Sequence, residues 1–269
     1  MPVHAEAPAE SIHFPAPDFD VREFARTAVG SHRGNLNLQS YASQPLTAQT
    51  LRALAYLHNV ESATMSHLRG VLVTATHKDA RITAFLATWA FEKYWIADAL
   101  AQIIQWHVDN GADAPAAALT NAPAERTVRE SIVANFIGVP MIGVHMALCT
   151  VDEWLTQAAY ERIAALDANP QLAETLAALR SVKARQLTFF EAQARFRLTE
   201  SKRSRTMTAS RLRKTSWPIG SRAEPTEETA FFFSYLFATA PELVAKLDAR
   251  VDDLPGQQGL GLIRKASTT

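Results

Sequence analysis

The chain has 269 residues, of which 48% are hydrophobic, and its 27 basic side chains balance its 27 acidic ones. This length accommodates one large domain with a substantial core, and zero formal charge provides no general attraction to nucleic acid or to an anionic membrane surface. The single cysteine, Cys149, excludes an internal disulfide and a thiolate-rich zinc site, which fits a reducing cytoplasm.

Residues 1–22 are rich in proline and alanine and contain no basic segment followed by an apolar run. A secretory signal peptide needs that pattern, so we expect a flexible arm here and a cytoplasmic protein. Residues 23–269 are expected to form a single helical domain, because glycine is scarce and apolar residues recur at helical spacing.

Four long helices are predicted, at about residues 47–76, 78–107, 125–166 and 171–200, with Pro140 bending the third. Helices of this length, joined in pairs, indicate an all-α fold whose core is a four-helix bundle over about residues 47–200. Extra helices are expected at both ends of the chain, and residues 201–269 are predicted to form an accessory helix and a turn-rich tail.

The third predicted helix contains an uncharged stretch, residues 131–151, that is long enough to cross a bilayer. Asn135, Pro140 and His145 interrupt this stretch, and charged residues border it on both sides. We interpret it as the buried central helix of a bundle and predict no membrane span.

Each predicted long helix has an apolar face, and one charged residue interrupts each face near its middle. In chain order the faces are Leu51, Leu54, His58, Glu61, Met65, Leu68 and Leu72; Ile82, Leu86, Trp89, Lys93, Ile96, Leu100 and Ile103; Ile142, Met146, Cys149, Glu153, Thr156, Tyr160 and Ile163; and Leu172, Leu176, Leu179, Lys183, Gln186 and Phe190. The charges Glu61, Lys93, Glu153 and Lys183 are expected at one depth in the bundle. The alternative is that some faces are rotated, so that these charges point into solvent.

Three segments resemble the ferritin-like di-iron superfamily, in particular its acyl-carrier-protein desaturase branch. EKYWIADAL is similar to the family's E-E-x-x-H-G-x-A-L, VKARQLTFFEAQAR to its D-E-A-R-H-x-x-F-Y, and DEWLTQAAY to its third-helix glutamate segment. In that family two helices each supply one glutamate and two each supply Glu-x-x-His. The resemblance covers about residues 45–200 and implies a ferritin-like four-helix bundle.

The metal-ligand motifs implied by this resemblance are degenerate. Matched by position, the two Glu-x-x-His motifs become Lys93-x-x-Ile96 and Lys183-x-x-Gln186, and a register that starts at Glu92 has a tryptophan at the histidine position. A protonated lysine only donates hydrogen bonds and cannot coordinate a metal, whereas a di-iron site needs several carboxylates and histidines. We therefore predict that the protein binds no metal here and needs no cofactor.

Two lysines beside two glutamates form a set of zero net charge that can be buried as ion pairs. We predict that Lys93 and Lys183 each pair with Glu61 or Glu153, the two glutamates that remain at the family's ligand positions. These four are the candidate catalytic residues. The candidate ligand-binding residues around them are Trp89, Ile96, Tyr160, Gln186 and Phe190.

The functional hypothesis is a metal-free ferritin-like protein that binds a small hydrophobic or acyl-like ligand or a protein partner. One alternative is a cofactor-free enzyme in which Lys93 or Lys183 acts as a nucleophile or base. A second alternative is a di-iron oxidase or oxygenase with unusual ligands, drawn from His58, His145 and the two glutamates.

Radical chemistry at a modified tyrosine, as in a metal-free branch of the ribonucleotide reductase radical subunit, is not expected. That branch has its tyrosine one turn after the second-helix histidine, where this chain has Leu100. Tyr94 and Tyr160 are nearby in the sequence, but neither matches that position.

Residues 195–214 carry eight arginines and lysines and one glutamate. This run is typical of a solvated helix end, and the resemblance implies the alternative of a docking surface for an acyl carrier protein. Nucleic acid is not an expected partner, because the run contains few aromatic residues. The aromatic run at residues 229–241 predicts either an accessory helix or half of a homodimer interface, and we expect the second.

Overall fold

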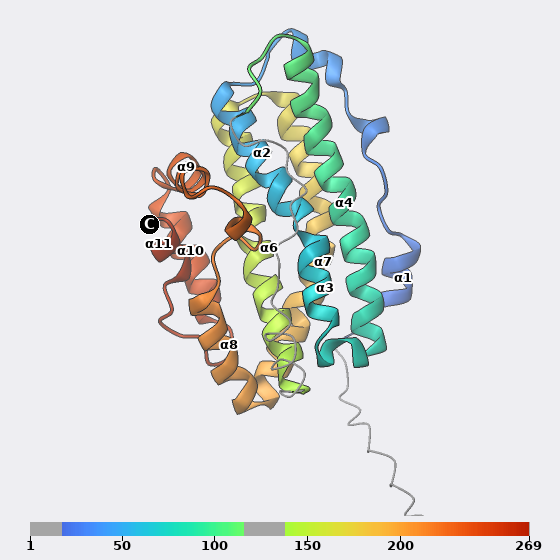
Figure 1. Cartoon of the computed structure of the whole chain (residues 1–269), viewed down its shortest axis with the longest axis vertical. Helices are drawn as coiled ribbons and strands as arrows, with labels where there is room; N and C mark the ends of the chain where they lie inside the picture. The colour runs from blue at the N-terminus through green and yellow to red at the C-terminus, as the bar shows by residue number, and fades with distance from the viewer. Residues whose placement is uncertain (1–17, 116–137, 269) are drawn as a thin grey trace, which may run out of the picture.

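The computed structural model describes residues 18–115 and 138–268, and these residues form helices and turns with no strand among them (Figure 1). The helices are α1 (Val21–Arg26), α2 (Ala48–Ser62), α3 (Thr64–Leu72), α4 (Ala80–Asp109), α6 (Pro140–Asp167), α7 (Pro170–Glu200), α8 (Lys202–Lys214), α9 (Thr226–Phe237), α10 (Pro241–Asp252) and α11 (Leu262–Ala266). The predicted all-α class is confirmed.

Four long helical segments lie side by side along the molecule, namely α2 with α3, α4, α6 and α7, called here the central helices (Figure 1). Side chains cap three of them at the N-terminus, since Thr47, Asp79 and Asn169 accept hydrogen bonds from backbone N–H groups of the first turn. The predictions for residues 78–107 and 171–200 agree closely with α4 and α7.

The third predicted helix differs from the observed one at Pro140. α6 begins at this proline rather than bending there, because a proline at the first helical position loses no backbone hydrogen bond. The predicted residues 125–137 lie outside the described part of the chain.

The first predicted helix is interrupted at Ala63, since α2 ends at Ser62 and a separate helix, α3, runs from Thr64 to Leu72. Gly220 packs against the break: a Cβ at this glycine would lie 2.9 Å from the Cβ of Ala63, and its φ of 103° favours glycine. Met65 was predicted on the core face but is 50% exposed, because the break alters the register of α3 relative to α2.

The predicted faces of α4, α6 and α7 are all buried. Their aromatic side chains pack directly, with ring centroids 3.7 Å apart for Phe85 and Phe189 and 5.2 Å apart for Trp89 and Phe190. The charges on these faces therefore lie inside a closely packed core, and the alternative of rotated helices is wrong for α4, α6 and α7.

The described end of the N-terminal arm packs against the central helices. Phe19 contacts Phe85 and Phe189 with ring centroids 5.8 and 5.2 Å apart, and Val21 and Phe24 of α1 are buried. Residues 18–22 are thus held in place, whereas residues 1–17 lie outside the described part.

Helices α8 to α11 cover one side of the central helices (Figure 1). The aromatic helix α9 packs on α2, where Phe232 stacks on Tyr56 with centroids 4.5 Å apart, and Phe233 and Phe237 are also buried. Of the two predicted alternatives, the accessory helix is the one observed. The same chain covers this face of α9, whereas Phe231 and Tyr235 are half-buried; a role of α9 in a dimer interface stays a prediction.

Within residues 18–115 and 138–268, no single helix is long and apolar enough to cross a membrane. The helices α9 and α10 meet that criterion only as a pair, and they are bent by 105° relative to each other. The described portion of the uncharged stretch predicted to be buried belongs to α6, whose residues from Ile142 to Thr156 are buried.

Candidate functional site

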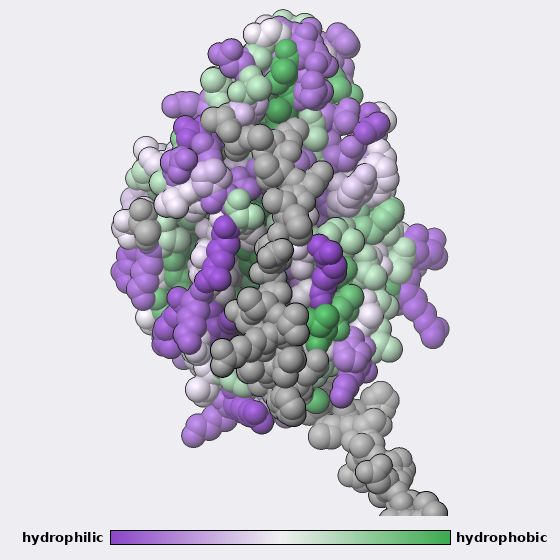
Figure 2. Space-filling view, viewed as in Figure 1, coloured by the Kyte–Doolittle hydropathy of each residue, from purple (hydrophilic) through white to green (hydrophobic). Residues whose placement is uncertain are grey.

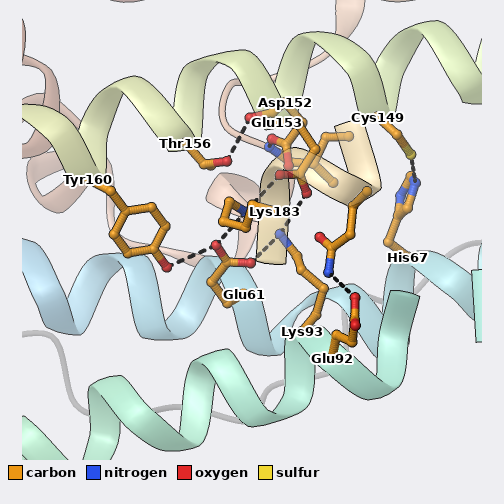
Figure 3. A network of polar contacts seen from close by, with 12 residues as sticks. Glu61, His67, Glu92, Lys93, Cys149, Asp152, Glu153, Thr156, Tyr160 and Lys183 are labelled. Atoms are coloured by element: carbon orange, nitrogen blue, oxygen red, sulfur yellow. Dashed lines mark hydrogen bonds and ion pairs between the residues drawn. The ribbon is translucent and has the colours of Figure 1, made fainter. Parts of the chain in front are cut away.

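Each of the four central helical segments contributes one charge to a single buried cluster, called here the Lys–Glu cluster (Figure 3). The Lys183 ammonium lies 2.8 Å from a Glu61 oxygen and 2.9 Å from a Glu153 oxygen. The Lys93 ammonium lies 3.1 Å from the other Glu153 oxygen and also pairs with Glu61. The predicted pairing is confirmed, and each lysine bridges both glutamates rather than choosing one.

The cluster is buried, with side-chain exposures of at most 2% for its four members. Burial opposes ionisation of Glu61, but the ammonium groups of Lys183 and Lys93 outweigh burial and lower the pKa of this carboxyl to about 2. Burial likewise opposes the charge on Lys93, but Glu153 and Glu61 raise the pKa of this ammonium well above its ordinary value. Glu61 is therefore an anion and Lys93 a cation at neutral pH.

Tyr160 extends the cluster along α6. Its hydroxyl donates a hydrogen bond of 3.0 Å to Glu61, and its ring lies under the Lys183 ammonium at 5.7 Å. Burial raises the pKa of Tyr160 well above its usual value, and the neighbouring Glu61 adds to the shift. This tyrosine is thus a hydrogen-bond donor to the cluster, whereas Tyr94 is 58% exposed on the surface of α4.

A third buried carboxylate, Glu92, lies beside the cluster. From the sequence it was considered only as the start of an alternative metal-ligand register and was not predicted to be a site residue. Its two oxygens accept hydrogen bonds from Arg185 at 2.7 Å, from Gln186 at 2.8 Å and from the backbone N–H of Val29 at 3.0 Å. The predicted ligand-binding residue Gln186 therefore contacts Glu92. The sequence did contain a signal for this contact, because each partner lies close to a cluster lysine. Glu92 directly precedes Lys93, and Arg185 lies two positions after Lys183.

Asp152 is the second missed carboxyl group, next to Glu153 on α6. Burial raises its pKa to about 7, Lys93 opposes this shift, and Glu153 adds to it. The backbone N–H of Ile219 donates to its carboxylate at 2.6 Å. Asp152 therefore joins α6 to the loop that packs on the break between α2 and α3, and its charge changes near neutral pH.

The predicted ligand-binding side chains Trp89, Ile96, Tyr160, Gln186 and Phe190 are brought together around the cluster, and none is more than 3% exposed. The two pockets of about 550 Å³ that described residues form contain none of them. Trp89 borders a void of about 10 Å³ beside Cys149 and Asp152, which is about the size of one water molecule. The interior around the cluster is therefore filled by side chains.

A cleft of about 550 Å³ lies between the α2–α3 segment and α4 and is called here the His58 cleft. Its lining comprises His58, Glu61, Ser62, Thr64, Met65, Ser66, Arg69, Tyr94, Ala97, Asp98 and Ala101. His58 hydrogen-bonds to Asn59 at 3.0 Å, and burial lowers its pKa. The other candidate histidine, His145, contacts the Thr76 hydroxyl at 2.9 Å.

Comparison with protein-family models, curated proteins and solved structures gave no match. The residues present also do not fit a di-iron centre, because two ammonium groups already pair with the carboxylates that remain at the family's ligand positions, and an ammonium cannot coordinate a metal. Among residues 18–115 and 138–268, no group of three or more His, Cys, Asp and Glu side chains could hold a metal ion. Assignment to a family therefore depends on the resemblance alone.

Proposed function

We propose that this chain is a ferritin-like four-helix bundle in which the Lys–Glu cluster replaces the di-iron centre. Its function is to bind a small hydrophobic or acyl-like ligand without redox chemistry. The observation that carries the proposal is the mutual bridging of Lys93 and Lys183 with Glu61 and Glu153. These four residues come one from each central segment, and they stand at the positions that the resemblance matches to the family's metal ligands.

The electrostatics of the cluster favour a binding protein over a lysine-centred enzyme. A nucleophilic lysine must lose its proton, but the carboxylates of Glu153 and Glu61 raise the pKa of Lys93. The ammonium of Lys183 is fully buried and contacts the same two carboxylates. The ion pairs supply the cohesion that bound metals would otherwise supply, so the cluster holds the bundle together.

The same geometry argues against the alternative of a di-iron oxidase with unusual ligands. His58 and His145 bond to Asn59 and Thr76 in the described structure rather than to the glutamates of the cluster. A metal between Glu61 and Glu153 would have to displace two ammonium groups that already form ion pairs with these carboxylates.

The ligand is expected outside the packed interior, in a pocket that opens to the surface. Both pockets of about 550 Å³ have the volume of a typical small-molecule site. Hydrophobic side chains also gather on the surface over α3 and α4 (Figure 2), where Met65, Val73, Phe91 and Tyr94 are 45% to 58% exposed.

A protein partner is the second candidate, and α8 is its expected docking surface. Arg195, Arg197 and Arg205 make internal contacts, whereas Lys202, Arg203, Arg211, Arg213 and Lys214 are exposed. This exposed half of the 195–214 run would suit an acidic carrier protein. Homodimer formation remains a proposal without a defined interface.

Elemental analysis of the protein purified from iron- and manganese-supplemented cultures tests the proposal. We expect less than about one tenth of a metal ion per chain, because the cluster offers no ligand set. One or two ions per chain would contradict the replacement of the metals by lysine. Titration with decanoate, a neutral decanol probe and decyl phosphate then tests the binding role, and failure of all three to bind would contradict it.

A further inference from the structure

A pocket of about 550 Å³ lies away from the Lys–Glu cluster, between the end of α8, the loop before α9, α9 itself and α11. It is called here the Trp217 pocket. It is lined by Leu212, Arg213, Thr215, Ser216, Trp217, Ser221, Arg222, Glu224, Thr226, Thr229, Phe233, Leu262, Lys265 and Ala266. Segments from four parts of the C-terminal third thus meet at one hollow.

The walls of this pocket are apolar. Leu212, Trp217, Phe233 and Leu262 are each at most 5% exposed and belong to the hydrophobic core. They present their surfaces to the hollow from three helices and a loop. An apolar ligand body would therefore contact hydrophobic side chains on several sides.

The rim of the pocket is cationic. Arg213, Arg222 and Lys265 border it and are exposed, and neither arginine forms an ion pair within the part of the chain that is described. The one acidic residue of the lining, Glu224, accepts a hydrogen bond from Asn59 at 2.9 Å. Helix α8, which ends at this rim, carries basic residues and no acidic one, and hydrophilic side chains gather along it in Figure 2.

A buried donor at the pocket has no acceptor. The indole N–H of Trp217 has no hydrogen-bond partner among the described residues, although the side chain is only 5% exposed. An indole N–H can only donate, and an unpaired buried donor is costly. The N–H itself is enclosed by protein atoms, so the cationic rim and the apolar walls, rather than this donor, define what the pocket can bind.

We propose that the Trp217 pocket binds an amphipathic anion, with an oxyanion head at Arg213 and Arg222 and an apolar body between Leu212, Phe233 and Leu262. The head is a carboxylate or a phosphate, because both provide the acceptor oxygens and the negative charge that guanidinium groups recognise. This inference depends on the proposed binding function and names both the pocket and the chemical class of its ligand.

Calorimetric titration of the full chain with decanoate and decyl phosphate tests the proposal, because these ligands carry the two candidate head groups on the same apolar chain. Decanol supplies the apolar body alone, and acetate and inorganic phosphate supply the heads alone. We expect at least one decyl anion to bind about tenfold or more tightly than decanol and than its own head group, since charge-assisted hydrogen bonds and apolar burial both contribute. The preferred head identifies the ligand as a carboxylate or a phosphate. Equal binding of decanol would overturn the anionic character, and equal binding of a head group alone would overturn the amphipathic character.

The Arg213→Gln/Arg222→Gln double variant should weaken binding of the preferred anion by about tenfold or more. The matched control is Lys202→Gln/Arg203→Gln, which also removes two positive charges, both from α8, but changes no residue of the pocket lining. Equal affinities in the double variant and its control would overturn the assignment.

A pair of pocket-filling variants separates this inference from the proposed function. Ala266→Trp fills the Trp217 pocket and Ala101→Trp fills the His58 cleft, and both alanines are half-buried lining residues. We expect only Ala266→Trp to abolish binding. Loss of binding in Ala101→Trp alone would overturn the Trp217 pocket while leaving a binding function in place.

Discussion

The ammonium of Lys183 lies 2.8 Å from the carboxylate of Glu61, although 122 positions separate the two residues in the chain. This contact joins α7 to α2 across the centre of the protein. Since Lys93 and Glu153 complete the cluster from α4 and α6, the four central segments are linked by charge as well as by apolar packing. The stability of the fold should therefore depend on the charge balance of the cluster.

Lys93→Met should lower the free energy of unfolding by about 3–5 kcal/mol, because it leaves two buried carboxylates with a single ammonium, that of Lys183. The double variant Lys93→Met/Glu153→Gln restores zero net charge and should recover a large part of this loss. Urea unfolding followed by circular dichroism measures both. Lys78→Met is the matched control at an exposed lysine and should change little. A stable Lys93→Met protein would contradict the role assigned to the ion pairs.

The depressed pKa of Glu61 predicts acid destabilisation within a defined pH range. The folded-state pKa of about 2 lies below the ordinary value of 4.5, so the stabilisation is present above pH 4.5 and is lost as the pH falls towards 2. The loss should reach roughly 2 kcal/mol by pH 3. Urea unfolding at pH 5.5, 4 and 3 measures it. A Glu61→Gln variant should show a weaker pH dependence in that range, and an unchanged dependence would assign the acid sensitivity to other carboxyl groups.

Asp152 should have the opposite effect to Glu61 on how the stability of the fold depends on pH. Its folded-state pKa of about 7 lies above the ordinary value of 3.8, so its contribution to stability is largest below pH 3.8 and is lost as the pH rises through 7. Asp152→Asn keeps an oxygen that can accept from Ile219 and removes the charge. Its stability relative to the unmodified protein should rise by up to about 1.4 kcal/mol per pH unit between pH 5 and 7. A constant difference between the two proteins over this range would contradict the assignment.

Helical periodicity was sufficient to predict the cluster but not its surroundings. Lys93, Glu153 and Lys183 lie on long, uninterrupted helices, so their burial followed from the spacing of their apolar neighbours. Met65 was misplaced because the interruption at Ala63 depends on packing by Gly220, which is far away in the sequence. Glu92 and Asp152 were missed for a related reason: their partners Val29, Arg185 and Ile219 belong to other elements, and a helical pattern does not reveal such contacts.

The ferritin-like register itself can be tested by restoring the family's ligands. Lys93→Glu/Ile96→His/Lys183→Glu/Gln186→His rebuilds two Glu-x-x-His motifs beside Glu61 and Glu153, and Ile96 and Gln186 are fully buried, so both histidines would point into the interior. Four buried carboxylates without cations repel one another, so the variant should unfold at lower temperature without metal and should be stabilised by ferrous or cobaltous ions. Elemental analysis should find about two ions per chain, as in di-iron bundle proteins. The Lys93→Glu/Lys183→Glu control has the carboxylates without the histidines and should retain less metal. Metal content no higher than in the unmodified protein would mean that these positions do not correspond to the family's ligand positions.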